Sequence, residues 1–406
     1  MKSLAYLLLA MLTSPSAFAA QPAGAPADQA SAVKGSNAFA VDLYGQLRHQ
    51  PGNLFFSPES ISTAFAMAYA GARGQTATEM ASVFHFTLPQ DRLQPAMGAL
   101  LAGMNAPHNG YQLRVADALW AQQDESFLPT FLNTVETNYG AAFHPVNFKT
   151  SAESVGGMIN RWVEQQTNNK IQNLIGPGTL TPATRLVLTN AIYFKGDWRN
   201  QFEKSATKDE DFHLSAAQSI KTPMMHRTGS YPYYDGSTFQ ALELPYAGDD
   251  LAMVVLLPKE KTGLPALEQS FTAAALANWL QGLKPAAKVI LTLPRFNMTR
   301  QFELSGILAR MGMPQAFNDA ANFSGMNGKG GITISAAIHK AFIDVNEQGT
   351  EAAAATATVF QATAMRRPMP EPPPIIFRAD HPFLFLIRDT RTGSILFMGR
   401  VSDPAQ

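Results

Sequence analysis

Residues 345–364 read VNEQGTEAAAATATVFQATA, a stretch in which small and uncharged side chains follow a glycine. In steps of two from Thr350, one set of positions (350, 352, 354, 356, 358 and 360) holds no charged group. The other set holds the single carboxylate after that threonine, Glu351, and the single amide, Gln361. Because successive side chains of a strand point to opposite faces, this alternation predicts a strand that buries one face.

Local propensity offers a second interpretation of the same region. The alanine run by itself favours a helix, and Met365–Pro374 carries five prolines in ten positions, a composition typical of extended polyproline. Together the two segments could form an exposed linker. Without further context, the linker interpretation is favoured over the strand.

Composition indicates a large folded protein. The chain has 406 residues, of which 46% are hydrophobic and 15% charged, so a mostly disordered chain is excluded. The 31 basic and 31 acidic residues cancel, and no long run of either sign offers a phosphate-binding surface. We therefore expect no nucleic-acid partner.

The first nineteen residues are typical of a secretory signal peptide. Lys2 supplies the positive end, Leu4–Leu12 the apolar stretch, and Ala17-Phe18-Ala19 the small-x-small cleavage site. The apolar stretch is too short to span a bilayer comfortably, so we expect an exported protein, periplasmic or secreted, with no membrane partner. The chain has no cysteine, which excludes disulfides and thiol chemistry.

Beyond the signal peptide, residues 20–30 are rich in proline and small side chains and predict a flexible leader. No repeat and no linker composition follows, so a single α+β domain is expected from residue 31.

Hydrophobic patterns predict several elements of that domain. The expected elements are a helix ending near His49, a helix over Ile61–Ala70 preceded by Ser57-Pro58, a buried strand over Leu251–Leu257, and a C-terminal hairpin of Pro382–Arg388 and Ser394–Val401.

The stretch Val345–Ala354 resembles the proximal hinge of the reactive-centre loop of inhibitory serpins. Further motifs resemble the same family in the same order along the chain: Asn53–Pro58 (NLFFSP), Thr189–Trp198 (TNAIYFKGDW), Leu293–Phe296 (LPRF), Phe323–Gly325 (FSG), His339–Ala341 (HKA), Phe377–Phe385 (FRADHPFLF) and Phe397–Val401 (FMGRV). The resemblance spans residues 31 to 404. It implies one domain with three β-sheets, eight or nine helices and an exposed reactive-centre loop over about residues 347–376.

The resemblance also implies an activity. Members of this type are not enzymes but suicide substrates: a serine protease cleaves the loop, becomes esterified to it, and is trapped when the loop inserts into the main sheet as a new strand. We expect a bacterial, exported protein of this type, and the resemblance implies as its partner a serine protease held in a covalent complex, with cysteine proteases as a second class of target. No cofactor and no metal is implied, and we expect a monomer.

Site residues follow from the motifs, position by position. The resemblance implies three groups: a hinge (Glu347, Gly349, Thr350, Glu351, Ala352, Ala353, Ala354, Ala355), a breach at the top of the main sheet (Trp198, Arg295, Glu347) and a shutter under its centre (Ser57, Ser60, Asn190, His339). His339 is then a buried structural imidazole rather than a catalytic or metal-binding one.

The position of the cleaved bond stays open. Counting sixteen residues on from Glu347 gives Thr363, whereas counting eleven back from Pro382 gives Glu371. Prolines from Pro368 onward cannot join the interior of a sheet, and a bond before proline is a poor substrate. The window therefore contains Thr363, Ala364, Met365, Arg366 and Arg367, and reach into a specificity pocket favours Met365 or Arg366.

Two other classes of function are weighed against inhibition. The sequence contains neither a His-Glu-x-x-His motif nor a Gly-x-Ser-x-Gly elbow, which disfavours a metalloprotease or an α/β-hydrolase. A non-inhibitory serpin acting as a carrier or chaperone would be expected to carry a bulky or charged hinge, and Thr350 with the alanine run argues against it.

Overall fold

The computed structural model describes residues 24–140, 142–350 and 373–406. Its α-helices are α1 (Pro26–Leu47), α2 (Pro58–Tyr69), α3 (Gly74–Val83), α4 (Gln90–Asn105), α5 (Pro129–Tyr139), α6 (Phe148–Gln166), α7 (Leu264–Ser270), α8 (Ala273–Gln281), α9 (Ser305–Met311) and α10 (Ser324–Asn327). Within the described residues, none of them is both long and apolar enough to cross a membrane.

The strands form two hydrogen-bonded sheets. The nine-stranded sheet contains, in spatial order, β1 (Leu54–Phe56), β15 (Ile395–Val401), β14 (Phe383–Asp389), β8 (Leu251–Pro258), β7 (Phe239–Pro245), β6 (Ser219–Asp235), β9 (Lys284–Pro294) and β13 (Ile375–Arg378), with β5 (Lys208–His213) paired to β6. The six-stranded main sheet contains β10 (Phe296–Glu303), β11 (Ile334–Val345), β12 (Gly349–Thr350), β4 (Leu186–Asp197), β2 (Tyr111–Gln122) and β3 (Phe143–Val146).

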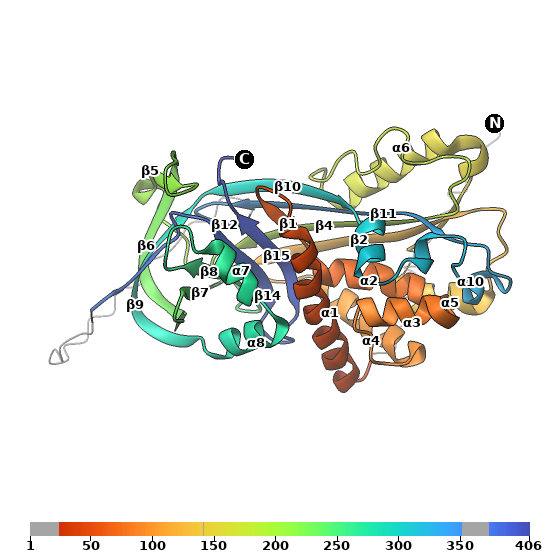
Figure 1. The fold of residues 1–406 in the computed structure, drawn as a ribbon, viewed down its shortest axis with the longest axis horizontal. Coiled ribbons are helices and arrows are strands. Elements are labelled where there is room, and N and C mark those ends of the chain that lie inside the picture. The colour runs from red at the N-terminus through yellow and green to blue at the C-terminus, as the bar shows by residue number, and fades with distance from the viewer. Residues whose placement is uncertain (1–23, 141, 351–372) are drawn as a thin grey trace, which may run out of the picture.

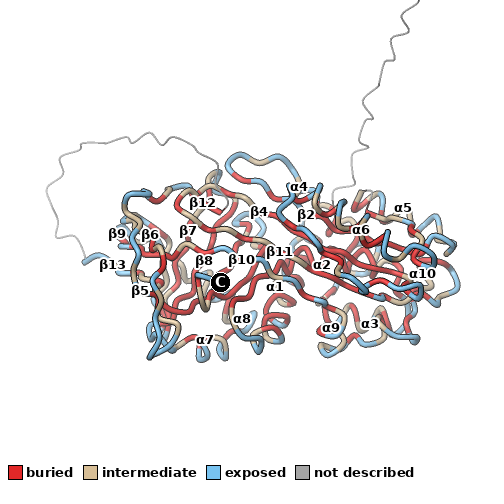
Figure 2. Tube along the Cα trace, turned by 90° about the horizontal axis from the view of Figure 1, so that it is seen from above, coloured by how far each residue is buried: buried red, intermediate tan, exposed pale blue. Residues whose placement is uncertain are grey.

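Helices cover both faces of the main sheet. Figure 1 shows α6 lying on one face, with α2 to α5 packed on the other. Under α6 a separate apolar cluster combines the helix residues Val155, Ile159 and Val163 with Trp120 of β2. The larger core fills the space between the main sheet, the nine-stranded sheet and α1, and Figure 2 shows buried residues along most of the central strands.

The α+β class and four local predictions are confirmed. The first helix ends at Leu47, and α2 begins at Pro58 with the Ser57 side chain accepting a hydrogen bond from the Ser60 amide. Strand β8 is buried along its whole length, and β14 pairs with β15 as the C-terminal hairpin.

One expectation is wrong, and two counts differ in detail within the expected fold. The leader predicted for residues 20–30 is wrong over 26–30, because α1 begins at Pro26, where proline fits the first helical turn, and the buried Asp28 pairs with Arg92. The described residues form ten α-helices where eight or nine were expected, with α10 a single turn. Hydrogen bonds join their strands into two continuous layers where three sheets were expected, because the 17-residue β6 pairs with β9 and, at its end, with β7.

Candidate functional site

The seam between β4 and β11 is the central feature of the main sheet. The two strands pair in parallel from Ile334 with Leu186 to Phe342 with Tyr193. Above this stretch they separate, and the two residues of β12 lie between them, antiparallel to both. The chain therefore already enters the sheet at one end of a seam that is closed over the rest of its length.

Gly349 and Thr350 make this entry possible in different ways. A Cβ atom at Gly349 would lie 2.0 Å from the Gly196 carbonyl oxygen, so only glycine permits such a close approach to β4. The Thr350 side chain is fully buried, and its hydroxyl lies 2.8 Å from the Tyr246 hydroxyl. Gly349 and Thr350, two of the predicted hinge residues, are thus part of the main sheet.

Trp198 holds the chain that leads to β12. Its backbone amide donates to the Gln348 carbonyl at 2.7 Å, and its indole nitrogen donates to the Asn346 carbonyl at 2.9 Å. The indole also stacks on Tyr246, with ring centroids 4.6 Å apart. Because Tyr246 also contacts Thr350, one aromatic pair supports the hinge on two sides.

An ion pair fixes the top of the seam. Arg295 donates to the Glu347 carboxylate through both Nε, at 2.7 Å, and Nη2, and the Thr207 hydroxyl donates to the same oxygen at 2.5 Å. Burial acts to raise the pKa of Glu347, but the hydrogen bonds from Arg295 and Thr207 hold it below its ordinary value. The carboxylate is 2% exposed, so it depends on these donors for its charge.

The predicted shutter residues lie together across the closed part of the seam. His339 on β11 and Asn190 on β4 are register partners, and the imidazole Nδ1 bonds the Asn190 side-chain oxygen. The Ser57 amide donates to His339 Nε2 at 3.1 Å, which assigns the proton to Nδ1. The Asn190 amide donates to the Ser60 hydroxyl, completing a chain of side chains from α2 to both strands.

Asp117 is a fifth member that the motifs did not identify. It is the register partner of Asn190 on β2, and its Oδ1 accepts hydrogen bonds from Asn190 and Ser60. Its Oδ2 is buried without a partner among the described residues. The available signal was an acid within the apolar run Val115–Trp120, where a strand buried on both faces has no room for a hydrated charge.

Burial favours the neutral form of both His339 and Asp117. Burial lowers the pKa of the His339 imidazole to about 3 and raises the pKa of the Asp117 carboxyl well above its ordinary value, although the donors around Asp117 act in the opposite direction. Stability from His339 is lost as the pH falls below about 6.5, where the unfolded histidine takes up a proton. The contribution of Asp117 to the free energy of unfolding is lost as the pH rises above about 4, because the acid then ionises in the unfolded chain first. Between about pH 4 and 6.5 the contributions of His339 and Asp117 therefore change with pH in opposite directions.

The structure brings together the predicted breach and shutter, and the first part of the hinge. Trp198, Arg295 and Glu347 meet at the top of the seam, and the four predicted shutter residues meet under its centre. The remaining hinge residues (Glu351 and Ala352–Ala355) and all five reactive-bond candidates (Thr363 to Arg367) lie outside the described residues. Thr207 and Tyr246 also belong to the breach, and no local motif in the sequence marks them.

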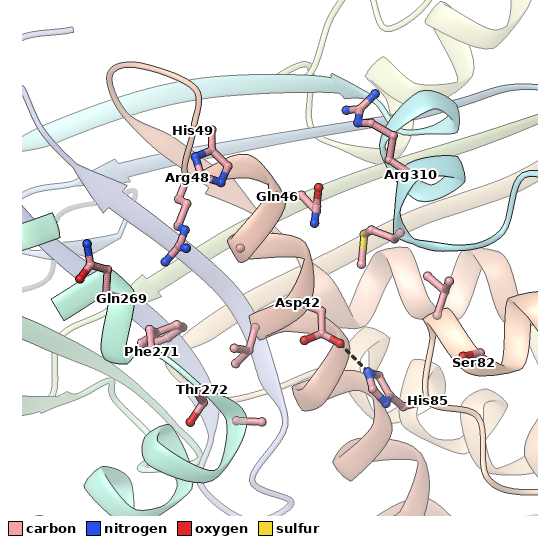
Figure 3. Close-up of a pocket in the computed structure, with 15 residues that line it drawn as sticks. Asp42, Gln46, Arg48, His49, Ser82, His85, Gln269, Phe271, Thr272 and Arg310 are labelled. Carbon is pink, nitrogen blue, oxygen red and sulfur yellow. Dashed lines mark hydrogen bonds and ion pairs between the residues drawn. The ribbon is translucent and has the colours of Figure 1, made fainter. Parts of the chain in front are cut away.

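A pocket of about 740 Å³ between α1, α3 and α8 contains another group of reactive side chains. Figure 3 shows Asp42 joined to His85, at 2.7 Å, with Ser82 beside the same pocket. Among the described residues, Ser82 and His85 are joined only by a backbone hydrogen bond from the His85 amide to the Ser82 carbonyl at 3.4 Å, and no hydrogen bond joins the Ser82 hydroxyl to the imidazole. The side chains of His85 and Asp42 are 38% and 55% exposed. The three residues therefore lack the serine–histidine contact of a nucleophilic triad.

Comparison with known proteins gives a consistent result. A family model described as "Serpin (serine protease inhibitor)" matches residues 34–404. An uncharacterized serpin-like protein of Thermococcus kodakarensis is 42% identical over 92% of this chain and 85% of its own length. The leukocyte elastase inhibitor of Homo sapiens is 40% identical over 90% of this chain and 97% of its own.

Solved structures agree with these matches. The crystal structure of uncleaved ovalbumin superposes with a TM-score of 0.83 at 31% identity, covering 92% of this chain and 100% of ovalbumin. The similarity therefore extends over nearly the whole described fold.

Asp117→Asn tests the proposed neutral acid in the shutter. The amide keeps the acceptor oxygen and cannot ionise, so the variant should gain stability over the parent by up to about 1.4 kcal/mol per pH unit above pH 4. Urea unfolding between pH 4.5 and 7.5 measures this difference. The exposed Asp319→Asn should show no such pH-dependent gain, and equal behaviour of the two variants would contradict the assignment.

Arg295→Met tests the ion pair at the breach. The change leaves a buried Glu347 carboxylate without its cation, and because Arg295 itself is 42% exposed we expect a loss of roughly 2 kcal/mol in unfolding free energy. The matched control is Arg310→Met on α9, which should change stability by less than about 0.5 kcal/mol. If the two substitutions cost the same in urea unfolding at pH 7, the pair does not hold the hinge.

Proposed function

Because the chain belongs to the serpin family, we propose that it inhibits serine proteases as a suicide substrate. The observation that carries this proposal is the position of β12. Gly349 and Thr350 occupy the first two positions of a strand between β11 and β4, and the sequence that follows is mostly alanine and threonine, which are small enough to continue it. The name of the 40% identical leukocyte elastase inhibitor supports an inhibitory activity.

The chemistry belongs to the target protease. Its serine oxygen attacks the carbonyl carbon of a bond between Ala362 and Arg367, an ester forms, and the amine of the C-terminal fragment leaves with a proton. This cleavage frees the N-terminal side of the loop, to which the protease is now esterified. Water must then attack the ester to release the enzyme, and inhibition requires that this second step stall.

Strand pairing supplies a driving force for insertion. A new strand that continues β12 would replace the parallel β4–β11 ladder with two antiparallel ladders, since β12 runs antiparallel to both neighbours. Parallel pairing is slightly less stable per residue, and the added strand also forms hydrogen bonds that the seam lacks. The intact protein is then held short of its most stable state by a kinetic barrier.

The shutter contributes to that barrier. A strand inserted between β4 and β11 moves them apart by about 4.8 Å, which breaks the contact between His339 and Asn190. Both side chains are buried, so their hydrogen-bonding groups must find new partners during opening. The network therefore delays opening of the seam.

Insertion would move the protease far from its docking position. About twelve residues at 3.3 Å each make a strand of roughly 40 Å. Loss of a single oxyanion donor costs about 10² to 10³ in rate, so distortion of the enzyme over such a movement is enough to stall deacylation.

Several finer features belong to this proposal. We infer export through cleavage after Ala19, on the strength of the signal-like residues 1–19, to the periplasm or the outside of the cell. We infer a monomer that acts on serine proteases, with cysteine proteases as a second class. Among the candidate bonds, those after Met365 and Arg366 are favoured over Thr363.

Thr350→Arg should convert the inhibitor into a substrate. Thr350 is already fully buried beside Tyr246, and a buried unpaired guanidinium is far less favourable than a hydroxyl. Cleavage should continue while the yield of trapped protease falls at least tenfold on denaturing gels. Thr350→Ser, which keeps the hydroxyl, should trap almost as well as the parent. Full trapping by Thr350→Arg would contradict the orientation of the residue 350 side chain toward the core.

A panel of trypsin-, chymotrypsin- and elastase-like proteases tests the function itself. We expect a detergent-resistant complex with at least one, and mass spectrometry of the released C-terminal fragment should place the bond between Ala362 and Arg367. Replacing both Met365 and Arg366 with glycine should abolish trapping of the protease that the parent inhibits best. Cleavage without any complex across the panel would refute the inhibitory function, and unchanged trapping by the glycine variant would assign the bond to Thr363.

A further inference from the structure

Few large apolar side chains of the described residues are exposed, and two of them lie side by side. Ile376 is 65% exposed and Ile290 is 38% exposed; the third, Met158, lies on α6 at 45%. Ile376 and Ile290 are register partners on the adjacent parallel strands β13 and β9. Isolated exposed apolar residues are common and need no explanation, but a contiguous pair on one surface does.

The pair lies on the solvent face of the nine-stranded sheet. Val289 and Leu291, on either side of Ile290, are buried in the core, and so is Phe377. The strand on the other side of β9 continues the row with Thr228, whose side chain is also exposed and which is the register partner of Ile290. We name the surface of Ile376, Ile290 and Thr228 the β9–β13 patch.

A purely structural role is the simplest alternative. Isoleucine has a high strand propensity, and β-branched residues paired across strands stabilise a sheet. Threonine is also β-branched and has a similar strand propensity, so replacing isoleucine with threonine keeps the contribution to the sheet and removes the apolar surface. This distinction allows a clean experiment.

The position of the patch points to its use. Strand β13 is the edge of the sheet and follows the proposed protease-binding loop directly. Figure 2 shows β12 and β13, which precede and follow residues 351–372, toward the same end of the molecule as β6 and β9. The patch therefore belongs to the end of the inhibitor at which a protease would engage.

Chain length limits how far away that protease can be. Nine residues separate Arg367 from Ile376, and thirteen separate Thr363 from it, which span at most about 32 and 46 Å when fully extended. A protease domain of roughly 230 residues has a radius of gyration of about 17 Å and is on the order of 40 Å across. A protease seated on the bond after Arg367 is thus within about its own diameter, on the order of 40 Å, of the patch, and one seated on the bond after Thr363 is within little more than that diameter.

We propose that the β9–β13 patch is a docking surface for the body of the target protease, contacting an apolar area outside its substrate cleft. The inference rests on the proposed inhibitory function and adds a second determinant of which protease is trapped. Such a contact strengthens the encounter complex and so raises the second-order rate of inhibition without altering loop insertion.

The charges beside the patch indicate what kind of contact to expect. Arg378, two residues from Ile376, is paired with both Glu210 and Asp380, and His226 on β6 also contacts Glu210. Opposite charges at this border are therefore largely compensated within the inhibitor. The contribution of the patch to inhibition should accordingly depend little on salt concentration, unlike a steering effect of unpaired surface charges.

The test compares the parent with the double variant Ile290→Thr/Ile376→Thr and with Met158→Gln on α6. The probe is whichever protease of the panel the parent traps fastest, measured at 0.05 and 0.5 M salt. We expect the double variant to trap about tenfold more slowly at both salt concentrations, with an unchanged ratio of inhibitor consumed per protease and an unchanged melting temperature. Met158→Gln should trap at the parent's rate.

Several outcomes overturn the proposal. Equal rates for the parent and the double variant would do so, as would an equal slowing in Met158→Gln. If the double variant melts early, the single Ile376→Thr, at the more exposed position, must still slow trapping several-fold. A concentration-dependent dimer that the double variant abolishes would assign the patch to a second copy of this chain. If the parent traps no protease, the proposed inhibitory function itself is wrong. If only the variant loses trapping, the inhibitory function stands, so the two results can be told apart.

Discussion

The parallel seam between β4 and β11 is the constraint on which the rest of the structure depends. Every other feature of the site either holds this seam closed or prepares one end of it to open. At the top, Gly349 brings the chain within contact of the Gly196 backbone, and Thr350 fills the space beside Tyr246. Along its length the strands keep a parallel ladder where an antiparallel third strand would pair with both.

The shutter shows how a buried polar network can serve such a seam. His339 and Asp117 flank Asn190 on opposite sides, one on β11 and one on β2, and burial favours the neutral form of both. Between about pH 4 and 6.5 the His339 contribution to the free energy of unfolding rises with pH, whereas the Asp117 contribution falls. Because the two slopes partly cancel, the stability of the closed shutter changes less with pH than it would with either group alone. At the top of the seam, hydrogen bonds from Arg295 and Thr207 hold the pKa of Glu347 below its ordinary value against the effect of burial.

Much of the fold was predictable because its signals are local. The Ser57-Pro58 start of α2, the buried β8 and the C-terminal hairpin each follow from a few neighbouring residues. The start of α1 was not predicted from local sequence, because Asp28 in its first turn pairs with Arg92, which is 64 residues away in the chain. The joining of strands through β6 into one nine-stranded layer was also not predictable, because the pairing of β6 with two different strands is a property of the assembled sheet.

The sequence by itself determined the small-residue alternation after Gly349, the order of the family motifs and the breach and shutter residues that those motifs contain. Only the tertiary structure decided that Thr350 is already buried, that Asp117 completes the shutter, that Thr207 and Tyr246 support the hinge, and that Ile290 and Ile376 share one exposed face. The physical reason is range: side-chain alternation and capping act over a few residues, whereas these contacts depend on strand register and on packing between segments far apart in the chain.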